Sequence, residues 1–305
     1  MTTLIFGHKS PDTDSTGSPL IWEWFLNETG IPSKAVLLGT PNTEAAFVAK
    51  EWGFDLPEVI TDVENDQSCV IVDTNNPAEL PSNINNADVL AIIDHHKLAG
   101  GLETKNPINI TIRPLACTAT IMHQMMGDTA KKMPKGVKGL MLSCILSDTL
   151  AFRSPTTTEI DKELAETLAK DLKVDIEEYA GRMFEAKSDV SAFSEAELLR
   201  MDSKEYAVDG KKFRVSVLET TAPKMILDRK DALVKAMPDV AKEDGVDQVL
   251  LFVVDILKEE ATMLVPNDLT KTVAEKSFDA KVDGDSVVLP GIMSRKKQII
   301  PALKV

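Results

Sequence analysis

The chain has 305 residues, of which 43% are hydrophobic and 27% are charged. These proportions exclude a disordered chain, and the length suits two domains that each bury a core. The 48 aspartates and glutamates outnumber the 34 lysines and arginines, which gives a formal net charge of −14. Such a charge argues against a binder of nucleic acid or of an anionic membrane surface, because both need clustered cations.

The sequence also indicates the compartment. No apolar run reaches the ~20 residues that a membrane-spanning helix needs. The first residues, MTTLIFGHKSPDTDS, lack the basic and long apolar regions of a secretory signal. The three cysteines, Cys69, Cys117 and Cys144, are odd in number and far apart. We therefore expect reduced, small buried residues in a cytoplasmic protein that has no membrane segment.

The first half of the chain alternates between strand-like and helix-like segments. Short apolar runs predict strands at 2–8, 34–39, 68–76 and 87–96. Apolar residues at helical spacing predict helices at 18–30, 44–53, 117–127 and 138–152. Because the runs at 68–76 and 87–96 are continuously apolar, they suit strands that are buried on both faces. This order predicts an α/β domain with a parallel sheet.

Beyond about residue 155 the charge increases and the order of elements changes. Segment 156–172 predicts an amphipathic helix with a threonine cap, and 185–202 is a polar, mostly helical stretch that could link two domains. A helix is predicted at 223–237, and further strands are predicted at 211–220, 247–257, 260–266 and 286–291. We expect a parallel-sheet domain over 1–188 and a smaller mixed α/β domain over 189–305.

Acidic and imidazole side chains stand at the ends of apolar runs in the first half. They are His8, Asp12, Asp14, Asp73, Asp94, His95, His96 and, in the helix at 138–152, Asp148. Ligands of open α/β sheets gather outside the carboxyl ends of the strands. These separate segments are therefore expected to meet at one edge of the sheet. Carboxylates so close together repel one another unless a cation neutralises them, so the pattern predicts a metal site.

The donor set indicates how many ions to expect and of which kind. Four negative charges come from Asp12, Asp14, Asp73 and Asp148. Two divalent cations would cancel them, with one carboxylate bridging ions ~3.5–4 Å apart. A mixture of carboxylate oxygen and histidine nitrogen without thiolate suits Mn²⁺, Co²⁺, Fe²⁺ or Zn²⁺ better than Ca²⁺.

Taken one at a time, these residues have simpler interpretations. Asp12 in S-P-D-T-D is typical of a turn or a helix cap, and Asp148 of a helix acid with a buried partner. Asp94 suits the role of holding a ring nitrogen of a neighbouring histidine. His123 lies in the helical pattern at 117–127 and is interpreted as structural.

Several short motifs make the sequence resemble a known family. They are H-K-S-P-D-T-D-S at 8–15, V-D-T-N at 72–75, I-D-H-H-K at 93–97, A-C-T-A-T-I at 116–121, L-S-D-T at 146–149 and P-G-I-M-S-R-K-K-Q at 290–298. All but the last resemble motifs of the DHH phosphoesterase superfamily. The last resembles the second domain of manganese-dependent, family II inorganic pyrophosphatases. The chain departs from the usual pattern at Ala116, where glycine is usual, and at the preceding Arg113-Pro114.

The resemblance implies a ligand set and cofactors. One Mn²⁺ would be held by His8, Asp12 and Asp73. The other would be held by Asp14, Asp73, His95 and Asp148, so that Asp73 bridges the two ions. The implied cofactors are two Mn²⁺ or Co²⁺ ions per subunit, with additional Mg²⁺ bound to the substrate. The implied assembly is a homodimer.

The resemblance also implies how pyrophosphate would be bound. His96 matches the residue that contacts the substrate near the scissile phosphorus, and it would act with Asp12 and Asp73 in catalysis. Arg295 and Lys296 match a phosphate clamp, and Lys204 is placed like a further substrate lysine. A water that bridges two cations is acidified toward a pKa of ~7 and supplies hydroxide for hydrolysis.

Two alternatives are weighed against a pyrophosphatase. Another DHH phosphoesterase would act on short oligonucleotides, cyclic dinucleotides or polyphosphate. The glycine-rich element of nuclease-type relatives is absent, and aromatic residues, which stack bases, make up only 5% of the chain. A metal-binding or nucleotide-sensing protein without catalysis would show a gap in the ligand set, and the sequence shows none.

Overall fold

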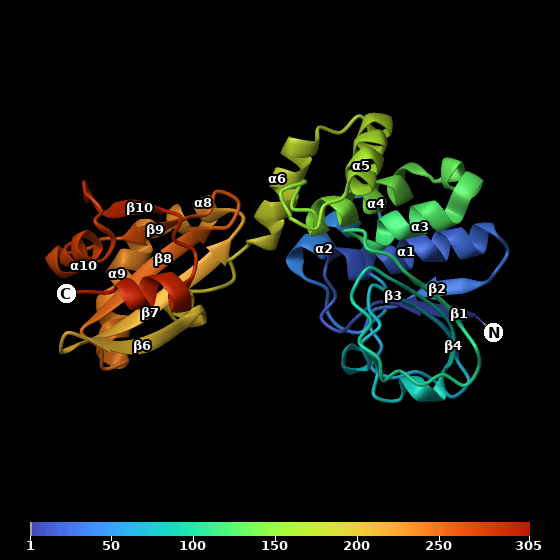
Figure 1. Ribbon diagram of the computed structural model, residues 1–305, viewed down its shortest axis with the longest axis horizontal. Coiled ribbons are helices and arrows are strands. Elements are labelled where there is room, and N and C mark those ends of the chain that lie inside the picture. The colour runs from blue at the N-terminus through green and yellow to red at the C-terminus, as the bar shows by residue number, and fades with distance from the viewer. Residues whose placement is uncertain (1) are drawn as a thin grey trace. The chain divides into compact units, whose positions relative to one another are not determined.

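The computed structural model describes residues 2–305, and the chain folds into two units (Figure 1). One unit extends to Lys187 and the other covers Ser188–Val305, a division one residue before the predicted boundary. Each unit contains one five-stranded sheet. The first sheet is parallel throughout and the second is mixed, which confirms the fold class predicted from the sequence.

The sheet of the first unit brings three strand ends side by side. Its strands are β1 (Thr3–Phe6), β2 (Ser33–Ala35), β3 (Ser68–Val72), β4 (Asp88–Asp94) and β5 (Asn109–Ile112). They lie in the order β2-β1-β3-β4-β5. Because all of them run parallel, the carboxyl ends of β1, β3 and β4 are neighbours at one edge. β5 was not predicted, since its residues are exposed or half-buried and form no continuous apolar run.

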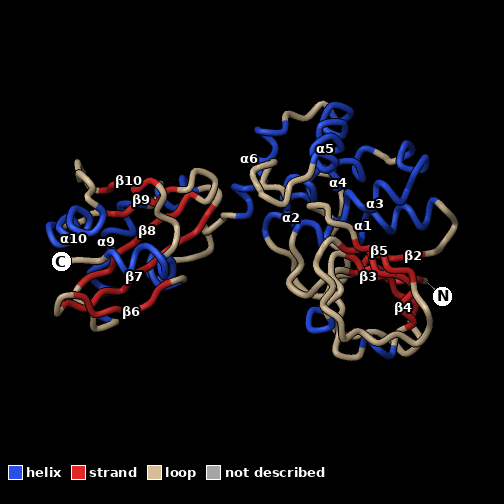
Figure 2. The backbone as a smooth tube through the Cα atoms, in the orientation of Figure 1, coloured by secondary structure: helices blue, strands red, loops and turns tan. Residues whose placement is uncertain are grey.

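Helices cover one face of this sheet (Figure 2). They are α1 (Thr13–Glu28), α2 (Thr43–Glu51), α3 (Thr118–Met126), α4 (Lys135–Asp148), α5 (Glu159–Leu172) and α6 (Ile176–Lys187), and short 3₁₀ turns cover Pro77–Glu79, Ile84–Asn86 and Gly127–Lys132. α1 and α3 contact the strands, and α4 packs against α1. On the other face, the loop residues Val63, Leu80 and Ile84 pack against Ile71 and Val89. β3 is therefore buried on both faces, as its apolar run predicted, whereas in β4 the prediction holds only toward the carboxyl end, because Leu90 is exposed.

The predicted start of the first helix is wrong. The apolar pattern placed the helix at 18–30, whereas α1 begins at Thr13. Asp12 caps this helix by accepting a hydrogen bond from the backbone N–H of Ser15 at 3.0 Å. The first turns of α1 carry polar side chains that are nevertheless buried, and Pro19 lies inside the helix. Hydrophobic periodicity could not reveal a helical segment of that composition.

The second unit is built on a mixed sheet. Its strands are β6 (Ser203–Val208), β7 (Lys211–Thr220), β8 (Gln248–Asp255), β9 (Glu260–Leu264) and β10 (Ser286–Pro290), in the order β10-β9-β8-β7-β6. Its helices are α7 (Glu195–Met201), α8 (Pro223–Leu227), α9 (Lys230–Glu243), α10 (Asp268–Phe278), a π-helical turn at Arg295–Ile299 and α11 (Ile300–Ala302). Successive residues of β8 enter two different cores, so both faces of this sheet are covered.

Two further expectations can be compared with the structure. The three cysteines are free and buried, as predicted. Over residues 2–305, the helices lack the length and apolar character that crossing a bilayer requires.

Candidate metal centre

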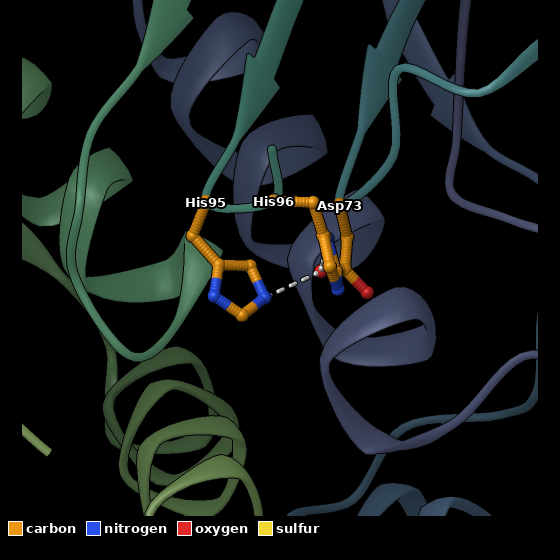
Figure 3. Close-up of side chains that lie close together, drawn as sticks. All are labelled: Asp73, His95 and His96. Carbon is orange, nitrogen blue, oxygen red and sulfur yellow. Dashed lines mark ion pairs between the residues drawn. The ribbon is translucent and has the colours of Figure 1, made fainter. Parts of the chain in front are cut away.

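Asp73 lies between two imidazoles that come from neighbouring strand ends. His8 follows β1, Asp73 follows β3 and His95 follows β4. Oδ1 of Asp73 lies 3.3 Å from Nε2 of His95 (Figure 3). Oδ2 of Asp73 lies 3.5 Å from Nε2 of His8. The two oxygens of one carboxylate therefore face two different nitrogen donors, which is the arrangement that a bridging ligand requires.

The backbone of Asp73 is held in a conformation that is uncommon for aspartate. Its φ is 58°, in the left-handed region, and the residue is buried. Its N–H donates to the carbonyl of Ile93 at 2.9 Å, which ties the strand end to β4. Non-glycine residues in this region cost of order 1–3 kcal/mol and cluster at functional sites, where the surroundings enforce them. The sharp turn is what directs the Asp73 carboxylate inward from the end of β3.

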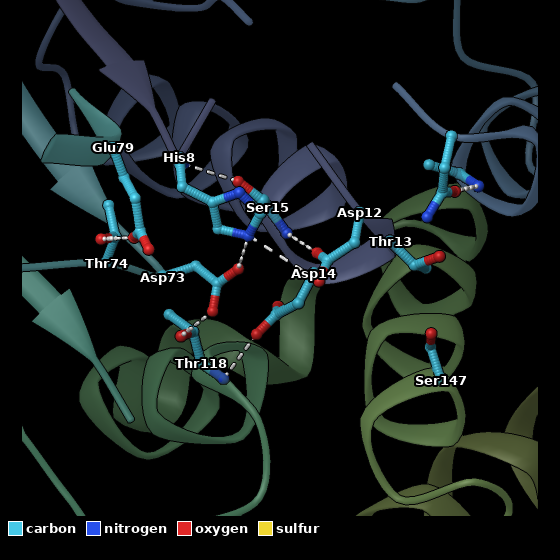
Figure 4. A network of polar contacts seen from close by, with 12 residues as sticks. His8, Asp12, Thr13, Asp14, Ser15, Asp73, Thr74, Glu79, Thr118 and Ser147 are labelled. Carbon is cyan, nitrogen blue, oxygen red and sulfur yellow. Dashed lines mark hydrogen bonds and ion pairs between the residues drawn. The ribbon is translucent and has the colours of Figure 1, made fainter. Parts of the chain in front are cut away.

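The start of α1 supplies two more carboxylates. Oδ1 of Asp12 caps the helix, while its Oδ2 lies 3.7 Å from Nε2 of His8. Asp12 therefore combines the predicted cap with a position in the cluster. Asp14 accepts a hydrogen bond from the N–H of Thr118 at 2.7 Å (Figure 4). It accepts another from Ser18 Oγ at 2.6 Å. Both acids thus have fixed orientations before any ion is added.

The end of α4 adds a third acidic segment. Asp148 is the last residue of α4, and one ligand atom from each of Asp14, Cys117 and Asp148 lies within 4.8 Å of the others. Among residues 2–305, the buried Oδ2 of Asp148 has no hydrogen-bond partner. An unpaired buried carboxylate oxygen is costly, and a cation would satisfy it.

Cys117 is a member of this group that the sequence interpretation treated only as a small buried residue. Burial raises the pKa of its thiol well above the usual range, and the charges of Asp14 and Asp148 raise it further. The sulfur therefore stays protonated in the metal-free protein and does not act as an anionic donor. The neighbouring Thr118 contacts the cluster directly, because its hydroxyl donates to Oδ1 of Asp73 at 3.2 Å. The A-C-T-A-T-I motif was the available signal for both residues.

Backbone carbonyls fix which nitrogen each ligating imidazole presents. Nδ1 of His8 lies 2.7 Å from the carbonyl oxygen of Lys9, and Nδ1 of His95 lies 3.3 Å from that of Leu115. Because a carbonyl only accepts hydrogen bonds, Nδ1 carries the proton in both rings. Nε2 is therefore the nitrogen that faces the carboxylates, and it becomes the donor to a metal ion once its proton is released.

His96 is oriented by Asp94. Nδ1 of His96 lies 2.9 Å from Oδ1 of Asp94, which is buried, and the His96 side chain is 53% exposed. The role predicted for Asp94, which was to hold a neighbouring ring nitrogen, agrees with this contact. The Asp94 contact raises the pKa of His96, and burial opposes this shift. His96 is therefore held in a fixed orientation at the edge of the cluster.

A pocket of about 410 Å³ adjoins His96 and His8. It is lined by His8, Lys9, Ser10, Thr74, Asn75, Asn76, Glu79, His96, Lys97 and Ala99. The two lysines and two histidines make it suitable for an anion of small size.

The carboxylates bind protons when no cation is present. Burial, followed by the charge of Asp73, raises the pKa of Asp14 to about 6. Burial also raises the pKa of Asp148 well above its usual range, with Asp14 and Asp73 as the next causes. Mutual repulsion is therefore relieved by protons, which a metal ion would displace.

The imidazoles respond to the same negative charge. Burial lowers the pKa of His8, but the carboxylates of Asp12 and Asp73 outweigh it and raise the pKa to about 11. Burial also lowers the pKa of His95, and the contacts with Asp73 and Asp14 raise it to about 9. The cluster is thus a pocket of oxygen and nitrogen donors that attracts positive charge, here met by protons, and it fits a divalent cation such as Mn²⁺.

The structure places the sequence-predicted metal ligands in two groups that share Asp73 and in a separate group of Asp14 and Asp148 with Cys117, which Thr118 links to Asp73 through its hydrogen bonds to Asp14 and Asp73. The predicted ligands are His8, Asp12, Asp14, Asp73, His95 and Asp148. The predicted substrate residues Lys204, Arg295 and Lys296 belong to the second unit, where Lys204 lies on β6. Nη1 of Arg295 donates to the backbone carbonyl of Asp202 and pairs with its carboxylate, both at 2.7 Å.

An Asp148→Asn variant should separate metal binding from folding. Burial and the neighbouring carboxylates raise the pKa of Asp148, which makes its negative charge costly in the metal-free protein, so asparagine should not lower the metal-free unfolding temperature. Mn²⁺ affinity should fall at least tenfold, since even partners of metal ligands contribute about 10–100-fold. Thermal unfolding with and without Mn²⁺ measures both effects. An undiminished stabilisation by Mn²⁺ would place Asp148 outside the ligand set.

Mn²⁺ affinity should rise as the pH is raised toward about 9. Below that pH both His8 and His95 are protonated in the metal-free protein, because their pKa values are about 11 and about 9. Binding must release these protons, so each one should strengthen the affinity about tenfold per pH unit. Calorimetric titration in buffers of different ionisation enthalpy counts the protons. Affinity that is independent of pH would contradict this electrostatic description.

Comparisons with known proteins agree with this geometry. Residues 2–146 match the DHH family, N-terminal domain, and residues 181–305 match the DHHA2 domain. Relatives named probable manganese-dependent inorganic pyrophosphatase include one from Lactobacillus helveticus, 38% identical with 98% of this chain and 97% of the relative covered. One from Deinococcus radiodurans shows the same identity and coverage. The chain is also similar to a solved structure from Methanococcus jannaschii that is described as a putative family II inorganic pyrophosphatase. The two are 34% identical with a TM-score of 0.62, and the match covers 99% of this chain and 98% of the other.

Proposed function

Because this chain belongs to the family of manganese-dependent inorganic pyrophosphatases, we propose that it hydrolyses inorganic pyrophosphate to two phosphates at a dinuclear metal site. The observation that carries the proposal is the position of Asp73, whose two oxygens face His8 and His95 from adjacent strand ends. Pairs of ions clamp the attacking and leaving oxygens in many phosphoryl-transfer sites.

We propose two ligand groups that share Asp73. His8 and Asp12 would complete one group, and Asp14, His95 and Asp148 would complete the other. When bound, Mn²⁺ ions supply Lewis acidity, which lowers the pKa of water and neutralises phosphate oxygens. The chain's own contribution is orientation, since carbonyls, the α1 cap and Thr118 already fix the donors.

The substrate needs further cations, because the four ligand carboxylates cancel the charge of two divalent ions. Pyrophosphate would be held by His96 from the first unit and by Lys204, Arg295 and Lys296 from the second. Mg²⁺ that arrives with pyrophosphate would complete the neutralisation. The contact with Asp94 supports this role for His96, because it fixes Nδ1 and leaves Nε2 on the other side of the ring. Preorganised charge of this kind is the main expected source of rate.

The proposal is tested by phosphate release. Protein that has been stripped of metal and reloaded with Mn²⁺ should hydrolyse Mg-pyrophosphate, and the stripped protein should not. A linear dinucleotide, assayed in parallel, represents the phosphodiester-cleaving alternative. A turnover of dinucleotide that equals or exceeds that of pyrophosphate would favour the alternative, and the absence of Mn²⁺-dependent phosphate release would refute the proposal.

A further inference from the structure

A buried carboxylate outside the predicted ligand set lies between two segments that carry metal-site aspartates. Glu44 is the second residue of α2 and is fully buried. Its Oε2 accepts hydrogen bonds from Thr13 Oγ1 at 2.8 Å and from Ser147 Oγ at 2.7 Å. Thr13 and Ser147 are both drawn beside the cluster in Figure 4. One oxygen atom therefore connects the start of α1 to the end of α4.

The two hydroxyl groups belong to residues that adjoin the candidate ligands. Thr13 lies between Asp12 and Asp14, and Ser147 directly precedes Asp148. Because a carboxylate only accepts hydrogen bonds, both hydroxyls must donate toward Glu44, which restricts their rotamers. Any shift of α1 along α4 would break one of these bonds. The same shift would separate Asp14 from Asp148, whose ligand atoms now lie within 4.8 Å.

The negative charge of Glu44 has a partner of its own. Nζ of Lys187 lies 3.3 Å from Oε2, and the first turn of a helix also favours a negative charge. Lys187 is the last residue of α6, so this ion pair also joins α6 to the start of α2.

We propose that Glu44 is a positioning residue for the metal centre, with Lys187 as its counter-charge. It holds the Asp12–Asp14 segment and the end of α4 at the separation that the ions require. The inference deepens the proposed function and depends on it for assigning metal ions to the site. Partners of metal ligands typically change affinity about 10–100-fold. Glu44 acts through the chain neighbours of ligands, so the lower end of this range is expected.

The test compares Mn²⁺ affinity among variants of the full chain. Glu44→Gln removes the charge but keeps the shape, and it should raise the Mn²⁺ dissociation constant about tenfold. Lys187→Met should also raise the Mn²⁺ dissociation constant, but by a smaller factor. Lys138→Met is the matched control, because it breaks an ion pair of α4 with Asp171, at 2.8 Å, away from the cluster. This control should leave Mn²⁺ affinity unchanged. The metal-free unfolding temperature and phosphate release are measured for every variant.

The outcomes separate positioning from a purely structural role. An unchanged dissociation constant in a folded Glu44→Gln protein, or an equal rise in Lys138→Met, would overturn the inference. If Glu44→Gln does not fold without metal, Ser147→Ala is the test instead, because it removes only one hydroxyl contact to Glu44. An unchanged Mn²⁺ affinity in Ser147→Ala would then overturn the inference. A wild-type protein that binds Mn²⁺ but releases no phosphate would refute the proposed function and leave the positioning of metal ions standing.

Discussion

An Asp73→Asn variant is expected to hydrolyse pyrophosphate with a kcat/KM about a thousandfold below wild type, which corresponds to ~4 kcal/mol of barrier. The carboxylate of Asp73 faces the Nε2 atoms of both His8 and His95, at 3.5 and 3.3 Å. Asparagine removes one negative charge and replaces one ligand oxygen by an amide nitrogen that cannot bind a cation. The affinity for Mn²⁺ should therefore fall at both ion positions. Phosphate release and Mn²⁺ titration measure the two effects.

Asp128→Asn is the control for this experiment. Asp128 also carries an ion-paired carboxylate in the first unit, but its side chain is 94% exposed, so the substitution should alter neither measurement. Loss of activity in Asp73→Asn without loss of Mn²⁺ would limit Asp73 to a contact with substrate. Unaltered activity would remove the bridging role altogether.

An Arg295→Lys variant should lose about a hundredfold in kcat/KM for pyrophosphate, although the charge is kept. Nη1 of Arg295 is already engaged by the carbonyl and carboxylate of Asp202. The planar guanidinium has further N–H groups that can donate to a phosphate at the same time. A lysine ammonium cannot keep the contact with Asp202 and present a fork to phosphate. Mn²⁺ affinity should stay at the wild-type value, because the predicted metal ligands all lie in the first unit.

Lys297→Met supplies the matched control for the clamp. Lys297 is an exposed cation two residues along the same π-helical turn, and nothing in the family resemblance assigned it to phosphate. Its replacement should leave kcat/KM close to wild type. Equal losses in Arg295→Lys and Lys297→Met would point to a general disturbance of this turn, and wild-type kinetics in Arg295→Lys would exclude direct contact with substrate.

The sheet of the first unit and its ligand-bearing edge could be predicted because both depend on local sequence. The continuously apolar runs that became β3 and β4 identify strands, and the polar residue that follows each run marks its carboxyl end. Parallel pairing then brings Asp73 and His95 together without further information. The same reasoning located His8 after β1.

The supports of the site could not be predicted, because they depend on contacts between distant residues. Asp14 is held by the N–H of Thr118, 104 residues further along the chain, and Glu44 by the hydroxyl of Ser147, 103 residues further along. No local pattern marks Glu44 as different from any other acid in the first turn of a helix. The early start of α1 was missed for a related reason, since its buried polar face is explained only by the partners it meets.

The surroundings of Cys117 have a consequence for resistance to oxidants. Peroxides and alkylating reagents attack the thiolate form of cysteine, and they must reach it. Cys117 is fully buried, and the carboxylates beside it raise the pKa of its thiol. Cys144, which is also buried with a raised pKa, shares this inertness. The protein therefore carries sulfur beside its candidate metal-ligating carboxylates without exposing a redox-sensitive nucleophile there.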